Sequence, residues 1–235
     1  MLSATHSVRS SAGPFSVTVL QPTVAKRCVV FAAGRGGNPL RHFGLLQDLV
    51  NRDLLVIAPH FDMLTSAIPG MEDLAGRVHR LASTIEQHCP ADLSLCGLGH
   101  SIGTVVLLVA AGAVATTLSG DELADSSFRA FSRLVLLAPP TDFFRRPGAL
   151  ASVSVPIQVW SGGQDSITPQ AQARFLVGAL DGKTGVDLRI EQRAGHFTFM
   201  DELPPHVSDP HPDRAGFLRA LAADASRFLE GDGRE

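Results

Sequence analysis

The sequence predicts an α/β fold in which helices cover both faces of a mostly parallel sheet. Strand-like and helix-like segments alternate along the 235 residues, as in right-handed βαβ units. Several strand-like segments are continuous apolar runs, which is typical of strands buried on both faces. Apolar residues make up 45% of the chain and charged residues 18%, enough to build a sizeable core. Because no repeat or linker interrupts the pattern, we expect one domain over residues 1–235.

The expected strands follow from apolar runs and from alternation. Residues 14–22 (PFSVTVLQP) alternate and are rich in valine, which favours an early strand at an edge of the sheet. Residues 27–34 (RCVVFAAG) form a continuous apolar run that ends in glycine. Residues 92–97 form a short strand, which Gly97 is expected to end. The remaining strands are predicted at 53–59, 133–139, 155–162 and 186–195.

The expected helices follow from apolar side chains at helical spacing. Residues 71–88 predict an amphipathic surface helix with charges opposite its apolar stripe, which consists of Leu74, Val78, Leu81 and Ile85. Residues 102–118 are apolar nearly all round, so this helix should be buried, and it is short for a membrane span. Two more helices are predicted near 169–181 and 213–230. Residues 39–52 predict another, with the stripe Leu40, Phe43, Leu46 and Leu49 or Val50.

Charge and composition restrict the classes of partner. The net charge is −3 with acidic and basic residues interspersed, which does not favour nucleic acid or an anionic membrane surface. The chain has three cysteines, Cys28, Cys89 and Cys96, which are too few for a disulfide framework and match no zinc pattern. We expect reduced thiols, with a Cys89–Cys96 bridge as the alternative. The N-terminal residues lack the apolar core of a secretory signal, so we expect a cytoplasmic protein that acts on a small molecule.

Gly99-His100-Ser101-Ile102-Gly103 lies between a predicted strand and the predicted buried helix. In a G-x-S-x-G turn, small residues two before and two after the serine let strand and helix approach closely while the serine adopts strained dihedral angles. The helix N-terminus beyond it presents backbone N–H groups suited to a developing oxyanion. The motif therefore predicts a nucleophile at Ser101; the alternative is a simple glycine-rich turn.

Two later strand ends carry the partners that such a serine requires. Asp165 follows the strand at 155–162 and can orient a histidine, although it is equally suited to a turn or helix cap. His196 follows the last strand and completes the chain order Ser, Asp, His. Asp142, at another strand end, is the alternative acid.

The glycine-rich loop AAGRGGNP follows the strand at 27–34. We expect it to bring the backbone N–H of Arg35 next to that of Ile102, so that the two form an oxyanion hole. The loop lacks the lysine of a phosphate-binding P-loop and the spacing of a dinucleotide fingerprint, which disfavours a nucleotide-binding, hydride-transferring protein.

These motifs resemble those of the α/β-hydrolase superfamily over nearly the whole chain. VVFAAGRGG with DLLVIAPHFD, then GHSIG, VWSGGQDSITP and AGHFTF, are similar to its oxyanion strand, following strand, nucleophile elbow, acid loop and histidine loop. AAGRGG and AGHFTFMDELPP resemble the branch with dienelactone-hydrolase-like and platelet-activating-factor-acetylhydrolase-like esterases. The resemblance implies Ser101 as nucleophile, His196 as general base, Asp165 as its orienting acid, the amides of Arg35 and Ile102 as oxyanion hole, and no cofactor.

The sequence departs from the family pattern at three places. Ala33 stands where many relatives have a histidine, Thr104 replaces a second glycine, and Ser101 replaces the cysteine of true dienelactone hydrolases, so a strict dienelactone assignment is disfavoured. Only residues 140–154 occupy the usual place of a lid, which predicts an open cleft. Substrate contacts are expected from Gly34, His100, Phe143, Trp160 and Phe197, with Phe199 and Met200 as further candidates and Arg145 and Arg146 at the rim.

The predicted activity is that of a serine esterase with a small-molecule ester substrate. The same residues suit a thioesterase, a lactonase or a cofactor-free perhydrolase, and a catalytically silent binding module is the alternative from another class. Residues 204–214 include polar side chains able to bind a metal at a surface, but their prolines favour a hydrated loop, so no catalytic metal is expected; these side chains are His206, Asp209, His211 and Asp213. The sequence gives no prediction of oligomeric state.

Overall fold

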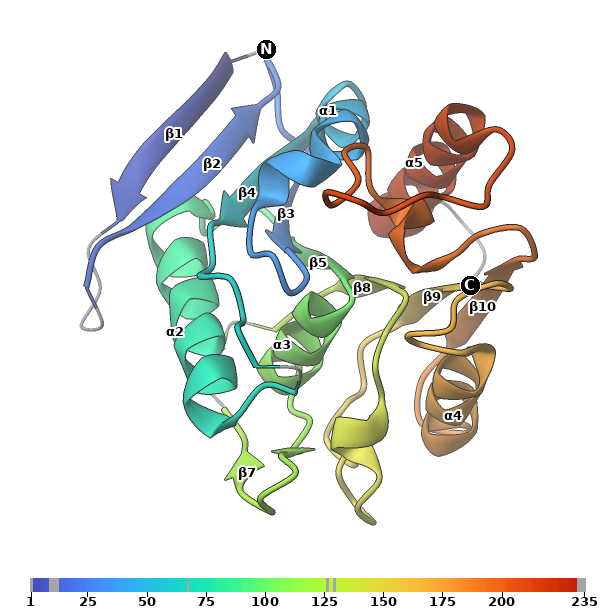
Figure 1. Cartoon of the computed structure of the whole chain (residues 1–235). Helices are drawn as coiled ribbons and strands as arrows, with labels where there is room; N and C mark the ends of the chain where they lie inside the picture. The colour runs from blue at the N-terminus through green and yellow to red at the C-terminus, as the bar shows by residue number, and fades with distance from the viewer. Residues whose placement is uncertain (1, 9–12, 67, 126, 129, 232–235) are drawn as a thin grey trace.

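The computed structural model describes residues 2–8, 13–66, 68–125, 127–128 and 130–231. These residues form an eight-stranded sheet in the order β1-β2-β4-β3-β5-β8-β9-β10 (Figure 1). Strands β1 and β2 pair antiparallel with each other, β2 pairs antiparallel with β4, and all other pairs are parallel. The bounds are β1 Leu2–Val8, β2 Phe15–Gln21, β3 Arg27–Ala32, β4 Leu54–Pro59, β5 Leu95–His100, β8 Arg133–Leu137, β9 Ile157–Gly162 and β10 Val186–Glu191.

Helices cover both faces of this sheet. Helix α1 (Phe43–Val50) packs against α5 (Arg214–Glu230) on one face, while α2 (Met71–His88), α3 (Ile102–Ala110) and α4 (Gln170–Leu180) cover the other (Figure 1). The central strands are buried from both sides, and every residue of β4 and β5 is inaccessible or nearly so. The predicted α/β architecture is confirmed. No helix in the described ranges combines the length and apolar character needed to cross a membrane.

The first strand of the sheet was not predicted. Strand β1 pairs with β2 along its whole length, so β2 is an inner strand and its predicted place at the edge is wrong. All residues of β1 except Val8 are exposed, and its sequence LSATHSV has too few apolar residues to signal a strand. Backbone pairing, rather than burial of side chains, holds this strand on the sheet.

The helix predicted at 102–118 is shorter than expected. All residues of α3 are buried, as predicted, but the helix ends at Ala110. Gly112 adopts φ +101°, which turns the chain out of the helix toward a short hairpin of β6 (Ala115–Thr116) and β7 (Glu122–Leu123). The apolar pattern therefore continues past the helix because this hairpin also packs on the core.

Further elements differ from expectation at their boundaries. Strand β10 ends at Glu191, four residues before its predicted end at 195. Residues 39–42 form a 3-10 turn before α1, and Leu40 and Phe43 are 41% and 40% exposed, so the predicted stripe of this segment is wrong at those two positions. Strand β5 continues to His100 instead of ending at Gly97. A Cβ at Gly97 would lie 2.7 Å from the Leu134 side chain, so this glycine serves close packing within the strand.

None of the three cysteines, all of which lie in the described part of the chain, is joined in a disulfide. Cys28 and Cys96 are buried in β3 and β5, and Cys89 lies half-buried at the end of α2. Burial raises the pKa of the Cys96 thiol, as expected for a structural rather than reactive cysteine.

Candidate active site

Ser101 occupies a sharp turn between β5 and α3. Its φ of +53° and ψ of −128° lie in a region that a residue other than glycine rarely adopts, at a cost of about 1–3 kcal/mol. The two predicted glycines make this turn possible. A Cβ on Gly103 would clash with the backbone of Ala32 in β3, and one on Gly99 would lie 2.8 Å from the Leu107 side chain. The predicted close approach of strand and helix is therefore present.

The three strand-end residues predicted from sequence lie in hydrogen-bond contact. His196 Nε2 is 2.9 Å from Ser101 Oγ, and His196 Nδ1 is 2.8 Å from Asp165 Oδ2. The side chains come from the ends of β5, β9 and β10, which meet at one edge of the sheet. His196 is 7% exposed and Asp165 is 5% exposed. This geometry allows a proton to pass from the serine hydroxyl to the imidazole.

Asp165 is held as an ionised acceptor. Its Oδ1 accepts the backbone N–H groups of Ile167 and Thr168, each at 2.8 Å, and its Oδ2 accepts the Thr168 hydroxyl at 2.6 Å. Burial opposes ionisation of this carboxyl, but the hydrogen bonds from His196 and Thr168 outweigh it and hold its pKa below the ordinary value. Sequence reasoning missed Thr168: the turn expected at Asp165 predicts bonds from nearby backbone N–H groups but not from a side-chain hydroxyl.

The alternative acid lies apart from this group. Asp142 bonds to Arg145 at 3.0 Å and to the amide of Gln172 at 2.7 Å, and its side chain is 70% exposed. The structure thus brings Asp165, and not Asp142, to His196.

Two neutral histidines pack behind His196. His100 Nε2 donates to the His196 carbonyl oxygen at 3.0 Å, and burial, together with the nearby His42 and His196, keeps the pKa of His100 well below 6.5. The His42 ring lies 5.1 Å from the His100 ring. Burial, with Arg41 nearby, lowers the pKa of His42 to about 3. Neither ring nitrogen of His42 has a hydrogen-bond partner in the described structure, and no sequence signal distinguished this residue.

The glycine-rich loop after β3 faces Ser101. Gly37 closes a turn by donating its N–H to the Gly34 carbonyl at 3.0 Å, with φ +73°. A Cβ at Gly34 would lie 3.3 Å from Ser101 Cβ, so the loop lies directly against the serine. Ile102 is the first residue of α3, and a helix leaves the N–H of its first residue without an intrahelical acceptor. The loop and this helix N-terminus thus border the space in front of Ser101.

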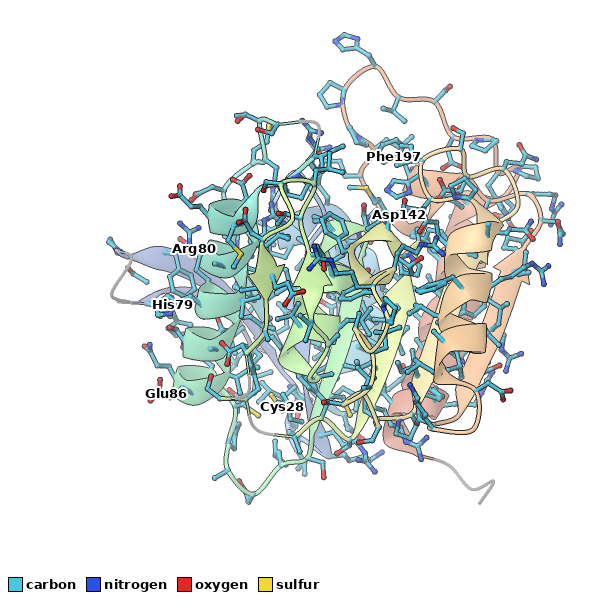
Figure 2. The ribbon with its side chains drawn as sticks, turned by 90° about the horizontal axis from the view of Figure 1, so that it is seen from below. Cys28, His79, Arg80, Glu86, Asp142 and Phe197 are labelled. Atoms are coloured by element: carbon cyan, nitrogen blue, oxygen red, sulfur yellow. The ribbon has the colours of Figure 1, made fainter. Side chains whose placement is uncertain are left out.

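A cavity of about 960 Å³ opens in front of these residues. Four of the predicted substrate-contacting residues line it, namely Gly34, His100, Phe143 and Phe197, and Met200 lines it as well. Figure 2 shows Phe197 and Asp142 from two loops that border this cavity. Trp160 does not line it, which corrects the prediction: its indole donates to Gln158 at 2.9 Å and its ring packs against Phe217. Phe199 is likewise in the core.

The mouth of the cavity is apolar. Four lining side chains are large, hydrophobic and exposed: Met63 (69%), Ile68 (49%), Leu118 (79%) and Ile167 (56%). The charged lining groups have partners within the protein. Arg35 donates to the Thr65 carbonyl at 3.0 Å, and Arg41 donates to the Leu203 carbonyl at 2.8 Å. The surface offered to a ligand is therefore largely apolar.

Two hydrogen bonds join polar residues within the 204–214 loop. Asp209 accepts the His211 backbone N–H at 2.8 Å, and His211 Nδ1 accepts the Asp213 backbone N–H at 3.1 Å. Within the part of the chain that the structure describes, no cluster of three or more His, Cys, Asp or Glu side chains is arranged to hold a metal ion.

The fold, with Ser101, Asp165 and His196 in the turns and loops that follow β5, β9 and β10, is the α/β-hydrolase fold. The chain is similar to a dienelactone hydrolase from Anabaena variabilis, with a TM-score of 0.73 and 21% identity over 99% of each chain. It is also similar to a thermophilic esterase from Thermogutta terrifontis (TM-score 0.69, 14% identity, 98% of this chain and 92% of that one). A third neighbour is an alpha-beta serine hydrolase homologue from Coxiella burnetii (TM-score 0.64, 16% identity, 96% and 98%).

These similarities are similarities of the three-dimensional fold, at 14–21% sequence identity. No protein-family model matches the sequence, and a search of curated proteins finds no match.

Proposed function

We propose that the protein is a serine esterase that cleaves carboxylic esters through an acyl-enzyme on Ser101. The observation that carries the proposal is the hydrogen-bonded series from Ser101 Oγ through His196 to Asp165, at 2.9 and 2.8 Å. As the serine oxygen bonds to the ester carbonyl carbon, its proton moves to His196 Nε2. Asp165, kept ionised by its hydrogen bonds, stabilises the imidazolium that forms.

The backbone N–H groups of Arg35 and Ile102 are proposed to bind the oxyanion that develops on the carbonyl oxygen. When the tetrahedral intermediate collapses, His196 gives its proton to the leaving alcohol and the acyl group stays on Ser101. Water then attacks the acyl-enzyme, His196 accepts its proton, and the carboxylic acid leaves as the serine recovers its hydrogen. This scheme requires no cofactor. All of its groups come from the single domain proposed for residues 1–235.

We further propose that the substrate is a neutral, mainly apolar small-molecule ester. The exposed hydrophobic side chains at the mouth of the cavity support this class of substrate. The hydrogen bonds that Arg35 and Arg41 donate to backbone carbonyls of the same chain support it as well. Two of the neighbouring structures of the Thermogutta terrifontis esterase have propionate and butyrate bound. Thioesters and lactones would react through the same steps, and no observation favours them over esters.

The proposal is tested by hydrolysis of p-nitrophenyl acetate, butyrate and octanoate by the wild type and by Ser101→Ala. We expect saturable hydrolysis by the wild type and a loss of about 10⁴-fold or more in kcat for the variant. Ser154→Ala, at an exposed serine, is the matched control and should behave as the wild type. A folded wild type that hydrolyses none of the three esters above the Ser101→Ala background would support the binding-module alternative.

A further inference from the structure

Arg77 is a buried arginine on the apolar side of α2. It follows Leu74 by three residues and precedes Leu81 by four, so helical spacing places it on the same stripe as these leucines. It is 3% exposed. A charged side chain is rarely buried to this extent unless its hydrogen bonds are satisfied. Its environment therefore indicates a specific task.

The guanidinium of Arg77 binds a row of backbone carbonyls. Nη1 donates to the carbonyl oxygens of Ala33 (3.2 Å) and Gly34 (2.9 Å), and Nη2 donates to those of Arg35 (3.0 Å) and Asp62 (2.8 Å). Three of these carbonyls belong to consecutive residues of the loop that faces Ser101. A planar fork with several fixed donors suits such a row, whereas a single ammonium does not.

The hydrogen bonds of the Arg77 guanidinium go to backbone carbonyls and not to a carboxylate. The Asp62 carboxylate pairs with Arg80, and Arg77 has no carboxylate at ion-pair distance among the residues the structure describes. The Phe61 ring covers the guanidinium, with its centroid 4.8 Å from Cζ. Burial lowers the pKa of Arg77 to about 10, so the group remains protonated at neutral pH.

Peptide geometry links these bonds to the space in front of Ser101. In a trans peptide the C=O and the following N–H point in opposite directions, and the structure has no cis peptide bond in the residues it describes. Because the Gly34 carbonyl points at Arg77, the Arg35 N–H points away from Arg77. Gly34 and Arg35 line the cavity with Ser101, whereas Arg77 lies behind them. The N–H is thus directed to the cavity side.

We propose that Arg77 is a positioning residue for the oxyanion hole: by binding the carbonyls of residues 33–35 from behind, it fixes the Gly34–Arg35 peptide with its N–H toward the carbonyl oxygen under attack. A charged donor on the carbonyl also polarises the peptide and strengthens its N–H as a donor. The proposal rests on the proposed esterase function. It means that a residue of α2, Arg77, holds the loop of residues 33–35 in place.

The test compares Arg77→Met and Arg77→Lys with Arg80→Gln. Arg80 projects from the same helix (Figure 2) and also binds a backbone carbonyl, that of His60, but not the loop of residues 33–35. We expect Arg77→Met to lower kcat by about 10²-fold with little change in KM, because the oxyanion forms only in the transition state. Arg77→Lys, which keeps the charge but not the fork, should lose about tenfold. Arg80→Gln should stay within about twofold of the wild type.

A second readout separates positioning from a general loss of structure. Phenylboronic acid forms a tetrahedral adduct with an active-site serine, so its Ki should rise by the same factor as kcat falls in each Arg77 variant. The exchange rate of the amide hydrogens of residues 34–36 should increase about tenfold or more in both Arg77 variants and not in Arg80→Gln.

The outcomes distinguish this inference from the proposed function. An active wild type with unchanged kcat, boronate affinity and loop exchange in folded Arg77→Lys would overturn the role of Arg77 and leave the esterase function standing. An inactive wild type would overturn the esterase function, and the exchange rates would still decide whether Arg77 fixes the loop. If Arg77→Met does not fold, Arg77→Lys, which keeps charge and similar volume, decides both readouts.

Discussion

Replacing Asp165 by asparagine changes one atom in the site and should reverse the tautomer of His196. In the native structure Oδ1 accepts two backbone N–H groups, and Oδ2 accepts the His196 Nδ1–H and the Thr168 hydroxyl. The two backbone donors will keep the asparagine oxygen in the Oδ1 position. Its NH₂ group then faces His196 Nδ1, which must become an acceptor. The hydrogen of the neutral ring moves to Nε2, which can no longer take the Ser101 proton.

The expected loss follows from the removal of this general base. A reversed histidine tautomer in a triad of this geometry lowers kcat by about 10⁴-fold, which corresponds to about 5.5 kcal/mol in the activation free energy. Asp142→Asn alters an exposed pair with Arg145, worth about 1 kcal/mol or less, and a hydrogen bond from Gln172, and Asp142 is not part of the hydrogen-bonded series of Ser101, His196 and Asp165. We expect Asp142→Asn to keep kcat within about threefold of the wild type.

The assay is steady-state hydrolysis of p-nitrophenyl butyrate at neutral pH, with the melting temperature of each variant measured in parallel. The asparagine variant should fold, since it keeps the volume of the side chain and the acceptor for the Ile167 and Thr168 amides. A kcat for Asp165→Asn within tenfold of the wild type, or a larger loss for Asp142→Asn, would refute the assignment of Asp165 as the orienting acid.

Three further predictions follow from burial and packing. The pKa of His42 is about 3 in the folded state and near 6.5 in the unfolded chain, so between pH 6.5 and 3 the unfolded state binds one proton more at this residue than the folded state. The free energy of unfolding is therefore unaffected by His42 titration above pH 6.5 and falls as the pH is lowered from 6.5 toward 3. His42→Leu should reduce the slope of unfolding free energy against pH between 4.5 and 6 by about 1.4 kcal/mol per pH unit, measured by urea denaturation; an unchanged slope would contradict the burial argument. Gly103→Ala should leave little folded, active protein, as judged by circular dichroism and hydrolysis, because its Cβ would clash with Ala32; a normally folded, active variant would show that strand and helix are not so close. Leu118→Ser combined with Ile167→Ser should raise KM for p-nitrophenyl octanoate by about tenfold and leave the acetate unchanged; equal effects on both esters would argue against an apolar binding surface at the mouth.

Much of the fold was predictable because elements that pack on the core carry apolar residues at regular spacing in the sequence. The α2 helix spans Met71–His88, as its spacing predicted, and all four residues of its predicted stripe are buried. The parallel strands β3, β4, β5 and β8 were visible as apolar runs because both of their faces are covered. Strand β1 was not visible, since its backbone pairs with β2 while its side chains stay in solvent. The end of α3 was missed because the chain stays apolar beyond it.

Some residues of the candidate site were likewise predictable from the sequence, and others were not. Ser101, Asp165 and His196 were predictable because each lies in a recognisable local motif after a strand: Ser101 directly follows β5, and the other two lie in the loops after β9 and β10. Arg77 was missed because its contacts are with backbone carbonyls far away in the sequence, which leave no pattern of residue types. Its position on an apolar stripe was the one available signal. Trp160 was predicted to contact substrate, but its side chain bonds to Gln158 and packs against Phe217.

The central claim is that Ser101 is a nucleophile activated by His196. Its most direct test is reaction with a fluorophosphonate, in which the serine oxygen bonds to phosphorus and fluoride leaves. In two neighbouring structures the Thermogutta terrifontis esterase is phosphorylated by paraoxon or phosphoramylated by tabun. Mass spectrometry of the intact protein should show one phosphonyl group per chain, mapped by peptide analysis to Ser101 and missing in Ser101→Ala. Failure of the folded wild type to react, or an equal reaction of Ser101→Ala, would contradict the account.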